Sequence, residues 1–311
     1  MQAVPLHILG LGVSTIDELL VLDHHPLPND KQPVLSRTRQ CGGLTGSALV
    51  AASRLGCRCG HVVTLGQGEL SAFLRREMER EGVKLFGPDD ESEAEPYFSM
   101  ILTQRDTGER TILWDNAFAR PPRIGPVERE AALRAKCLFV DHVYADTQLE
   151  LVSEAREAGV PVVGDFERTT PGSRELMDMT DHVILPLGYA RVLLGDGITA
   201  KEAVCELAAV RGRDLACVTD GLNGCWYALG SSPEVVSHQP AMPVTRVVDT
   251  TGCGDVFHGA YAAGIVHGWP AAERIRRSSA AAALKTRHQG AQAGAPYLEE
   301  LLEFLESQEN E

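Results

Sequence analysis

The segment Asp249–Asp255 (Asp-Thr-Thr-Gly-Cys-Gly-Asp) combines two glycines with two acidic residues directly before a helical pattern. Gly252 and Gly254 permit tight backbone turns and a close approach to a ligand. The first amides of a helix have no partners within the helix and lie at its positive end, so this segment predicts a site for a phosphate or another anion. The preceding Val247-Val248 is interpreted as the end of a strand.

Asp255 stands where that helix begins, and two roles are open to it. As a helix cap, an acid at this place contributes about 1 kcal/mol. As a general base, it would accept a proton from an attacking hydroxyl group and contribute about 10²–10⁴-fold in rate. The residue types alone do not choose between these roles.

Further candidate residues follow other apolar runs. Asp165 and Glu167 come just after the run 161–164, at the carboxyl end of a predicted strand, where open α/β sheets bind their ligands. Thr219–Gly224 (Thr-Asp-Gly-Leu-Asn-Gly) follows another such run, and its glycines allow the backbone to pass close to nucleotide phosphates. Taken alone this second signal is weak, because such compositions are common in turns.

The elements that would position these residues alternate along the chain. Short runs rich in Val, Ile and Leu indicate strands buried on both faces, and segments with helical spacing lie between them. This alternation predicts an α/β fold with a mostly parallel, doubly wound sheet. The predicted strands are His7–Gly12, Val62–Leu65, Cys137–Val140, Pro161–Gly164, His182–Leu185, Ala216–Thr219 and Cys225–Leu229, and the predicted helices are Ser47–Leu55, Ala72–Glu81, Thr147–Ala158, Ala200–Arg211, Val256–His267, Ala271–Lys285 and the tail Tyr297–Glu311.

Two more polar segments, Gln32–Gln40 and Tyr97–Trp114, are interpreted as strands outside the main sheet. The second contains Thr107-Gly108 between two apolar triplets, which is typical of a hairpin. We expect a small β lid drawn from about residues 13–40 and 96–118, within a single domain over residues 1–311. Exposed lid edges would be covered by pairing in a homodimer.

Bulk properties exclude several classes of partner. The 311 residues carry a formal net charge of -14, which repels phosphate backbones and anionic lipid, so neither nucleic acid nor a membrane is expected as a partner. No apolar stretch approaches the roughly 20 residues of a membrane helix, and no signal-peptide pattern opens the sequence. The eight cysteines form no Cys-x-x-Cys pair and are expected to be reduced thiols of a cytoplasmic protein.

The run Asp249–Ala260, with the pattern Asp-Thr-Thr-Gly-x-Gly-Asp-x-Phe-x-Gly-Ala, resembles the C-terminal signature of the ribokinase-like (PfkB) carbohydrate kinases. The resemblance covers most of the chain. It implies a ribokinase-like three-layer αβα sandwich with a small β lid, and an enzyme that uses ATP and Mg²⁺ to phosphorylate a hydroxyl group of a small sugar.

The resemblance also implies roles within this loop. Asp255 would be the catalytic base, and the amides of Gly252, Cys253 and Gly254 would bind the transferring phosphoryl group. Only the backbone of Cys253 is needed, so its thiol is not expected to be a nucleophile. Asp249 and Thr251 would hold the loop in place. In some members of the family, the residues at these two positions also help to bind a monovalent cation such as K⁺.

Other segments imply the sugar and nucleotide contacts. Gly12–Asp17 resembles the opening strand of the family with its sugar-binding aspartate, and Cys41–Ala48 resembles the first family signature. In that signature Ser47 stands where most members carry Asn, which leaves the identity of the sugar open. The implied sugar contacts are Asp17, Gly42, Gly43 and Ser47, and the implied nucleotide contacts are Thr219, Gly221, Gly224, Thr251, Lys285 and Gly290. Lys285 has a second interpretation, as a solvated end of its helix.

One departure concerns the metal. Many members carry Asn-x-x-Glu after the strand that here ends at Leu185, whereas this chain reads Pro186–Arg191 (Pro-Leu-Gly-Tyr-Ala-Arg). The acids expected to bind Mg²⁺ through water are therefore Asp165 and Glu167, since Mg²⁺ usually keeps several water ligands.

Within the family the likeness is closest to sulfofructose kinases, on Val248–Ala260 and Gly290–Pro296. Lys31 stands where those enzymes place a lysine that meets the sulfonate, whereas Trp114 and Val143 replace the other expected polar contacts. A sulfonate needs several charge-assisted donors, so another anionic sugar or a neutral ketose fits as well. Lys31 is equally well interpreted as an exposed lysine of the lid.

Two rival functions stay open. A non-catalytic sensor of sugar or nucleotide on the same fold would explain the missing Asn-x-x-Glu and the serine at position 47, but it would not need Asp255. A kinase for a nucleoside or a vitamin precursor is the other alternative.

Overall fold

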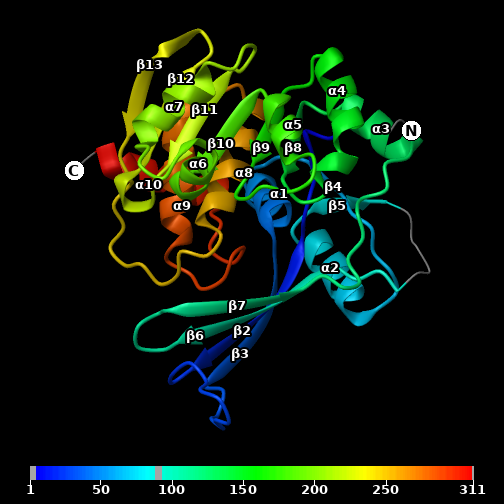
Figure 1. Cartoon of the computed structure of the whole chain (residues 1–311), viewed down its shortest axis with the longest axis vertical. Coiled ribbons are helices and arrows are strands. Elements are labelled where there is room, and N and C mark those ends of the chain that lie inside the picture. The colour runs from blue at the N-terminus through cyan, green and yellow to red at the C-terminus, as the bar shows by residue number, and fades with distance from the viewer. Residues whose placement is uncertain (1–4, 88–92, 310–311) are drawn as a thin grey trace.

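Alternate residues of the buried strands face two separate cores. In β1 (Ile8–Leu11), Ile8 packs into one apolar cluster, whereas Leu9 and Leu11 pack into the other. Successive strand residues point to opposite faces, so helices must cover the sheet on both sides. The computed structural model of the chain, which describes residues 5–87 and 93–309, has this arrangement (Figure 1).

Within these residues the main sheet has nine strands in the order β13-β12-β11-β10-β9-β8-β1-β4-β5. Neighbouring strands from β11 to β5 are parallel, and β12 and β13 add an antiparallel edge. The other strands of this sheet are β4 (Cys59–Val62), β5 (Val83–Phe86), β8 (Cys137–Asp141), β9 (Val162–Asp165), β10 (His182–Pro186), β11 (Leu215–Thr219), β12 (Cys225–Leu229) and β13 (Ser232–Gln239).

Two helical layers flank the sheet, which confirms the predicted αβα sandwich. One layer holds α1 (Leu44–Arg54), α2 (Glu69–Arg80), α8 (Cys253–Val266), α9 (Ala271–Lys285) and α10 (Leu298–Glu309). The other holds α3 (Pro126–Leu133), α4 (Leu149–Glu157), α5 (Ser173–Asp178), α6 (Leu187–Leu194) and α7 (Ala200–Ala208), with the short 3₁₀ turns Ala145–Thr147 and Gly221–Asn223 at strand ends. In the described part of the chain, no helix has the length and apolar character to cross a bilayer.

A second sheet of four strands stands away from the sandwich (Figure 1). Its order is β3 (Ser36–Gly42), β2 (Thr15–Leu22), β6 (Tyr97–Gln104) and β7 (Arg110–Asp115), with β2 and β6 parallel and the other pairs antiparallel. The hairpin predicted at Thr107-Gly108 joins β6 to β7. All six residues of β7 are exposed, so this edge strand is covered on neither face.

The sequence predicted lid strands within about residues 13–40, which contain β2, but it did not predict the bounds of this strand. Asp17 and Glu18 interrupt its apolar pattern, yet both side chains are buried. Glu18 is compensated across the strand pair by Arg37, at 2.7 Å, and by Arg39. A buried carboxylate is tolerated only with such partners, and residues that distant in sequence cannot be paired from the pattern alone.

Several predicted boundaries were wrong. The strand predicted at Val62–Leu65 lies earlier, at Cys59–Val62, because the small and polar residues there are buried, including His61. The segment predicted from Gln32 becomes a strand only at Ser36. Val247-Val248 is not a strand end: both side chains are about half-exposed, and the amide of Val248 donates to the carbonyl of Thr286, which is not part of a strand.

Candidate functional site

The loop before α8 has the geometry of an anion site. Gly252 caps α8 with φ of 79°, and a Cβ there would lie 2.7 Å from both Cα and the carbonyl oxygen of Ala291, so only glycine fits. The Cys253 amide donates to Thr250 O at 3.3 Å, whereas the amides of Gly252 and Gly254 have no acceptor within the described residues. Space is open beside Gly254. These donors therefore face a place where an anion can sit at the positive end of a 14-residue helix.

Asp255 occupies the first turn of α8, and its side chain makes no capping hydrogen bond there. The structure therefore does not support the role of Asp255 as a helix cap. Burial, followed by the charges of Glu167, Asp17 and Asp141, raises the pKa of the half-buried Asp255 well above its ordinary value. A carboxylate with a raised pKa holds an accepted proton more strongly, as a general base requires.

The side chain of Cys253 has no nucleophilic character. Burial raises the pKa of the Cys253 thiol to about 11, so it stays protonated near neutral pH. The raised pKa agrees with the expectation that the thiol is not a nucleophile.

Asp249 organises the start of the loop. Its Oδ1 accepts hydrogen bonds from the amide and the hydroxyl of Thr251 at 2.8 and 2.7 Å, and its Oδ2 accepts from the amide of Gly290 at 2.8 Å. Arg110, from β7 of the second sheet, donates to Asp249 Oδ1 at 3.2 Å and to the Thr251 hydroxyl. The four-stranded sheet is thus tied to the anion loop by a residue that sequence reasoning missed, since no local pattern distinguishes Arg110 from other basic residues of a hairpin.

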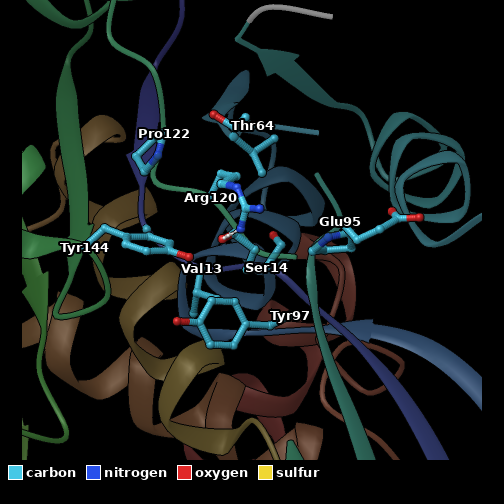
Figure 2. A pocket seen from close by; sticks show the side chains of 12 residues that line it. Val13, Ser14, Thr64, Glu95, Tyr97, Arg120, Pro122 and Tyr144 are labelled. Carbon is cyan, nitrogen blue, oxygen red and sulfur yellow. Dashed lines mark hydrogen bonds between the residues drawn. The ribbon is translucent and has the colours of Figure 1, made fainter. Parts of the chain in front are cut away.

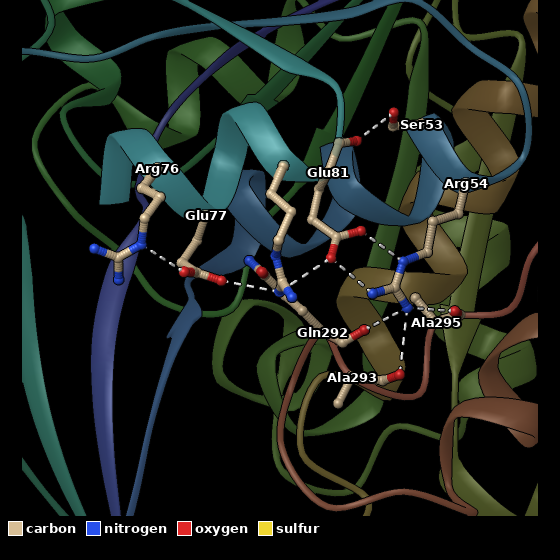
Figure 3. A network of polar contacts seen from close by, with 9 residues as sticks. Ser53, Arg54, Arg76, Glu77, Glu81, Gln292, Ala293 and Ala295 are labelled. Atoms are coloured by element: carbon tan, nitrogen blue, oxygen red, sulfur yellow. Dashed lines mark hydrogen bonds and ion pairs between the residues drawn. The ribbon is translucent and has the colours of Figure 1, made fainter. Parts of the chain in front are cut away.

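The segment that follows Gly290 contacts Arg54, the last residue of α1, as Figure 3 shows for Gln292, Ala293 and Ala295. The Arg54 guanidinium forms an ion pair with Glu81 and donates to the carbonyls of Gln292, Ala293 and Ala295 at 3.0, 3.3 and 2.7 Å. One planar fork of donors therefore fixes the course of the C-terminal loop beside Asp249.

Asp165, at the end of β9, is 1% exposed, and neither of its carboxylate oxygens has a hydrogen-bond partner among the described residues. His258 Nδ1 lies 3.3 Å from Asp165 Oδ2, but this nitrogen is directed to Gly254 O at 2.7 Å. Burial and the charges of Glu167, Asp255 and Asp141 raise the pKa of Asp165. A buried carboxylate with free oxygens fits a hydrated cation such as Mg²⁺, with the exposed Glu167 two residues further on.

Asp141, at the end of β8, joins three elements and was not singled out from the sequence. Its carboxylate accepts from the amide of Val13, the hydroxyl of Thr45 and the amide of Val143 at 2.8, 2.7 and 2.7 Å. These bonds fix the corner between β1 and β2 against the start of α1. Burial nevertheless raises the pKa of Asp141 to about 6.

Two cavities lie between the sandwich and the second sheet, and they share Val13, Tyr97 and Tyr144. The smaller one, into which Arg120 points in Figure 2, has about 20 Å³, room for about one water molecule. The larger one has about 480 Å³ and is the candidate sugar site. Its lining includes Thr15, Gly43, Ser99, Trp114, Asn116, His142, Arg168 and Thr170.

Most predicted sugar contacts lie at or beside this larger cavity. Gly43 and Trp114 line it. Asp17 is buried behind the lining residue Thr15, whose hydroxyl donates to its Oδ1 at 2.8 Å. A Cβ on Gly42 would lie 2.1 Å from Asp17 Oδ2, which explains the glycine. The fully buried Ser47 Oγ makes no hydrogen bond with described residues, although its nearness to Asp255 moderates the pKa of that acid.

Lys31 does not join this group. It is exposed on the loop between β2 and β3 and does not line the cavity. Arg168 lines it instead, and within the described residues its guanidinium makes no hydrogen bond or ion pair. Burial and the charge of Arg168 lower the pKa of the neighbouring His142 to about 4, so His142 is neutral near pH 7.

The predicted nucleotide contacts divide into two groups. Thr219 ends β11, and Gly221 and Gly224 follow in turns with φ of 52° and 82°. Thr251 and Gly290 belong to the loops tied by Asp249. The alternative interpretation of Lys285, as a solvent-exposed residue at the end of its helix, was wrong. Its side chain is fully buried, and its ammonium group donates to Asp249 O at 2.9 Å.

Comparisons with known proteins agree with this geometry. Residues 12–298 match the model of the pfkB family of carbohydrate kinases. The ribokinase of Haemophilus influenzae is 22% identical over 95% of this chain and 97% of its own length, and the ketohexokinase of Mus musculus is 24% identical over 91% and 97%. A solved structure from Agrobacterium tumefaciens, assigned as a ribokinase, covers 99% of this chain and 100% of its own with a TM-score of 0.88 and 26% identity. The Arabidopsis thaliana ribokinase, solved with ribose and ATP, covers 97% and 99% with a TM-score of 0.83 and 21% identity.

The site makes one prediction about stability. Burial raises the pKa of Asp17 from 3.8 to about 6, so the folded state binds this proton more tightly than the unfolded state. The contribution of Asp17 to the stability of the folded state is therefore fully present below about pH 4 and is lost as the pH rises through about 6. The difference in unfolding free energy, Asp17→Asn minus parent, should rise by up to about 3 kcal/mol across this window.

Urea denaturation at a series of pH values measures this difference. Asp196→Asn, at an exposed position, is the matched control and should give no such rise. If the difference in unfolding free energy between Asp17→Asn and the parent does not change with pH, burial does not raise the pKa of Asp17.

Proposed function

The chain belongs to the pfkB family of carbohydrate kinases, phosphotransferases that act on sugar hydroxyl groups, and we propose that it transfers the γ-phosphoryl group of ATP to a sugar held in the larger cavity. The observation that carries this proposal is the pairing of free loop amides at Gly252 and Gly254 with the adjacent Asp255. An anion site beside a carboxylate of raised pKa supplies what phosphoryl transfer to a hydroxyl needs.

In the proposed reaction the sugar hydroxyl gives its proton to the Asp255 carboxylate while its oxygen forms the bond to the γ-phosphorus. The bond from that phosphorus to the bridging oxygen breaks, and ADP leaves. The amides of Gly252 and Gly254 and the N-terminal end of α8 stabilise negative charge on the phosphoryl oxygens. Asp165 and Glu167 would hold hydrated Mg²⁺, which neutralises charge on the nucleotide phosphates.

The four-stranded sheet serves as a lid in this proposal, within one kinase domain. Arg110 joins the lid to Asp249 and Thr251, and Arg39 of β3 joins it to Glu69 of α2 at 2.5 Å. A lid held by such contacts excludes water from the cavity and limits transfer of the phosphoryl group to water.

The base assignment makes a direct prediction. Asp255→Asn should lower kcat by at least about 10²-fold, because the amide cannot accept the proton, and should leave ATP affinity little changed. ADP release under saturating sugar and nucleotide titration measure the two quantities. Turnover near that of the parent would remove Asp255 from the role of base.

For the acceptor, we propose a sugar with an anionic substituent that faces Arg168. This arginine lines the cavity without a described partner, beside the neutral His142 and the amide of Asn116. A guanidinium without a partner suits a carboxylate, phosphate or sulfonate, which needs charge-assisted donors when it leaves water. The exposed Lys31 lies outside this cavity lining, so Arg168 replaces it as the predicted anion contact.

A panel of ketoses, sugar phosphates, sulfosugars and nucleosides tests this substrate class through acceptor-dependent ADP release. An anionic sugar should stimulate best, and Arg168→Gln should raise its KM roughly 10-fold or more, which is the loss of one charge-assisted hydrogen bond. Lys31→Gln is the matched control and should leave that KM unchanged. If a neutral ketose or a nucleoside stimulates ADP release most strongly, the proposal is contradicted. If no acceptor stimulates ADP release, the alternative of a non-catalytic sensor is favoured.

We further propose that the lid edges pair in a homodimer. Leu113 and its neighbours Ile112 and Trp114 in β7 are 54%, 49% and 57% exposed, and pairing would cover them together with the free edge of the strand. Gel filtration with light scattering should show a dimer at micromolar concentration, and Leu113→Glu should shift it toward monomer. A monomeric parent protein would contradict this proposal.

A further inference from the structure

Lys285 is a buried cation with an unusual set of partners. It ends α9, it is 0% exposed, and it is the only lysine among the buried side chains of the described residues. Its Nζ donates to Asp249 O at 2.9 Å and to His288 O at 3.3 Å, and no carboxylate of these residues lies within ion-pair distance. Two main-chain carbonyls therefore solvate the ammonium, in the way that carbonyl oxygens solvate an alkali ion.

Those two carbonyls belong to the segments on either side of the anion loop. Asp249 begins the loop, and His288 belongs to the C-terminal loop that Arg54 holds in Figure 3. The two segments also meet where Gly252 packs against Ala291. The ammonium thus joins the two backbones whose contact sets the direction of the Gly252 and Gly254 amides.

The same residues leave little room for the monovalent cation that the family resemblance implies. Each oxygen of Asp249 already accepts from a donor: Oδ1 from Thr251 and Arg110, Oδ2 from Gly290, and the main-chain oxygen from Lys285. A K⁺ ion at Asp249 would compete with these donors and would face the repulsion of an ammonium and a guanidinium. These residues do not fit a K⁺ ion.

We propose that the Lys285 ammonium is a built-in monovalent cation that positions the phosphoryl-transfer loop, so that turnover needs no K⁺. Lys285 is then a positioning residue and not a nucleotide contact. The role rests on the proposed function of the Gly252–Gly254 amides. Burial lowers the pKa of Lys285, while the negative charges of Asp249 and Asp255 oppose this shift.

The first test is the response of the parent enzyme to cations. Its kcat should agree within about 2-fold in K⁺, Na⁺ and tetramethylammonium chloride at equal ionic strength, since the salt changes only screening. Activation of several-fold by K⁺ over tetramethylammonium would overturn the proposal.

The second test is Lys285→Met, which keeps a chain of similar length and leaves space for a small cation between the carbonyls. It should lose on the order of 10²-fold in kcat with a smaller change in the KM of the sugar, as expected for misplaced oxyanion donors. Ammonium or potassium ions at about 0.1 M should raise the kcat of Lys285→Met by at least about 10-fold. Tetramethylammonium is too large for the site and should not raise it. Lys285→Arg should retain more activity than Lys285→Met in the absence of these ions.

Lys201→Met, at an exposed position of α7, is the matched control and should show neither loss nor rescue. Near-parental activity of Lys285→Met, or a loss that no small cation restores, would contradict the proposal.

A readout independent of activity separates this inference from the proposed function. Ammonium ions should raise the Tm of Lys285→Met relative to tetramethylammonium at equal ionic strength, and should not do so for the parent. This selective shift is expected even if no sugar is phosphorylated. Its absence would contradict the cation site, whereas a parent that releases no ADP with any acceptor would contradict the kinase function alone.

Discussion

The close approach of α1 and α8 is the constraint on which the site depends. A Cβ at Gly259 of α8 would lie 2.1 Å from the carbonyl oxygen of Ala48, so the two helices meet through backbone. That contact brings the hydroxyl of Ser47 beside Asp255 and sets the start of α8 against the C-terminal loop at Ala291. With a side chain at Gly259 the helices would separate, and Asp255 and the loop before α8 would shift relative to Ser47 and Ala291.

The electrostatics of the site follow from this packing. Asp17, Asp141, Asp165 and Asp255 are gathered at the ends of strands and the start of a helix, and each has a raised pKa chiefly because of burial. For the proposed function a chain of net charge -14 must nevertheless attract ATP. In the proposed function, the positive end of α8, the nearby basic side chains and a hydrated Mg²⁺ would offset the acids locally, so that charge would be balanced within the site and not over the whole surface.

Local patterns in the sequence carried much of the fold and part of the site. The alternation of apolar runs and helical segments predicted the sandwich, and the loop 249–255 predicted the anion site, because both depend on neighbours in sequence. The roles of Arg110, Arg168 and Lys285 depend on partners or cavities made by distant segments. Arg110 is 139 residues from Asp249, and no periodicity reports such a contact. The bounds of β2 were missed for the same reason, since Glu18 is buried only because Arg37 and Arg39 meet it.

The central claim is that this loop transfers a phosphoryl group from ATP to a sugar hydroxyl. Phosphorus NMR of the enzyme with ATP, Mg²⁺ and a panel of sugars tests it most directly, because it follows ADP and the new phosphate ester together. The account predicts a phosphomonoester of one sugar that appears in equal amount with ADP and only in the presence of that sugar. ADP that forms with inorganic phosphate alone, at a rate independent of every acceptor, would contradict it.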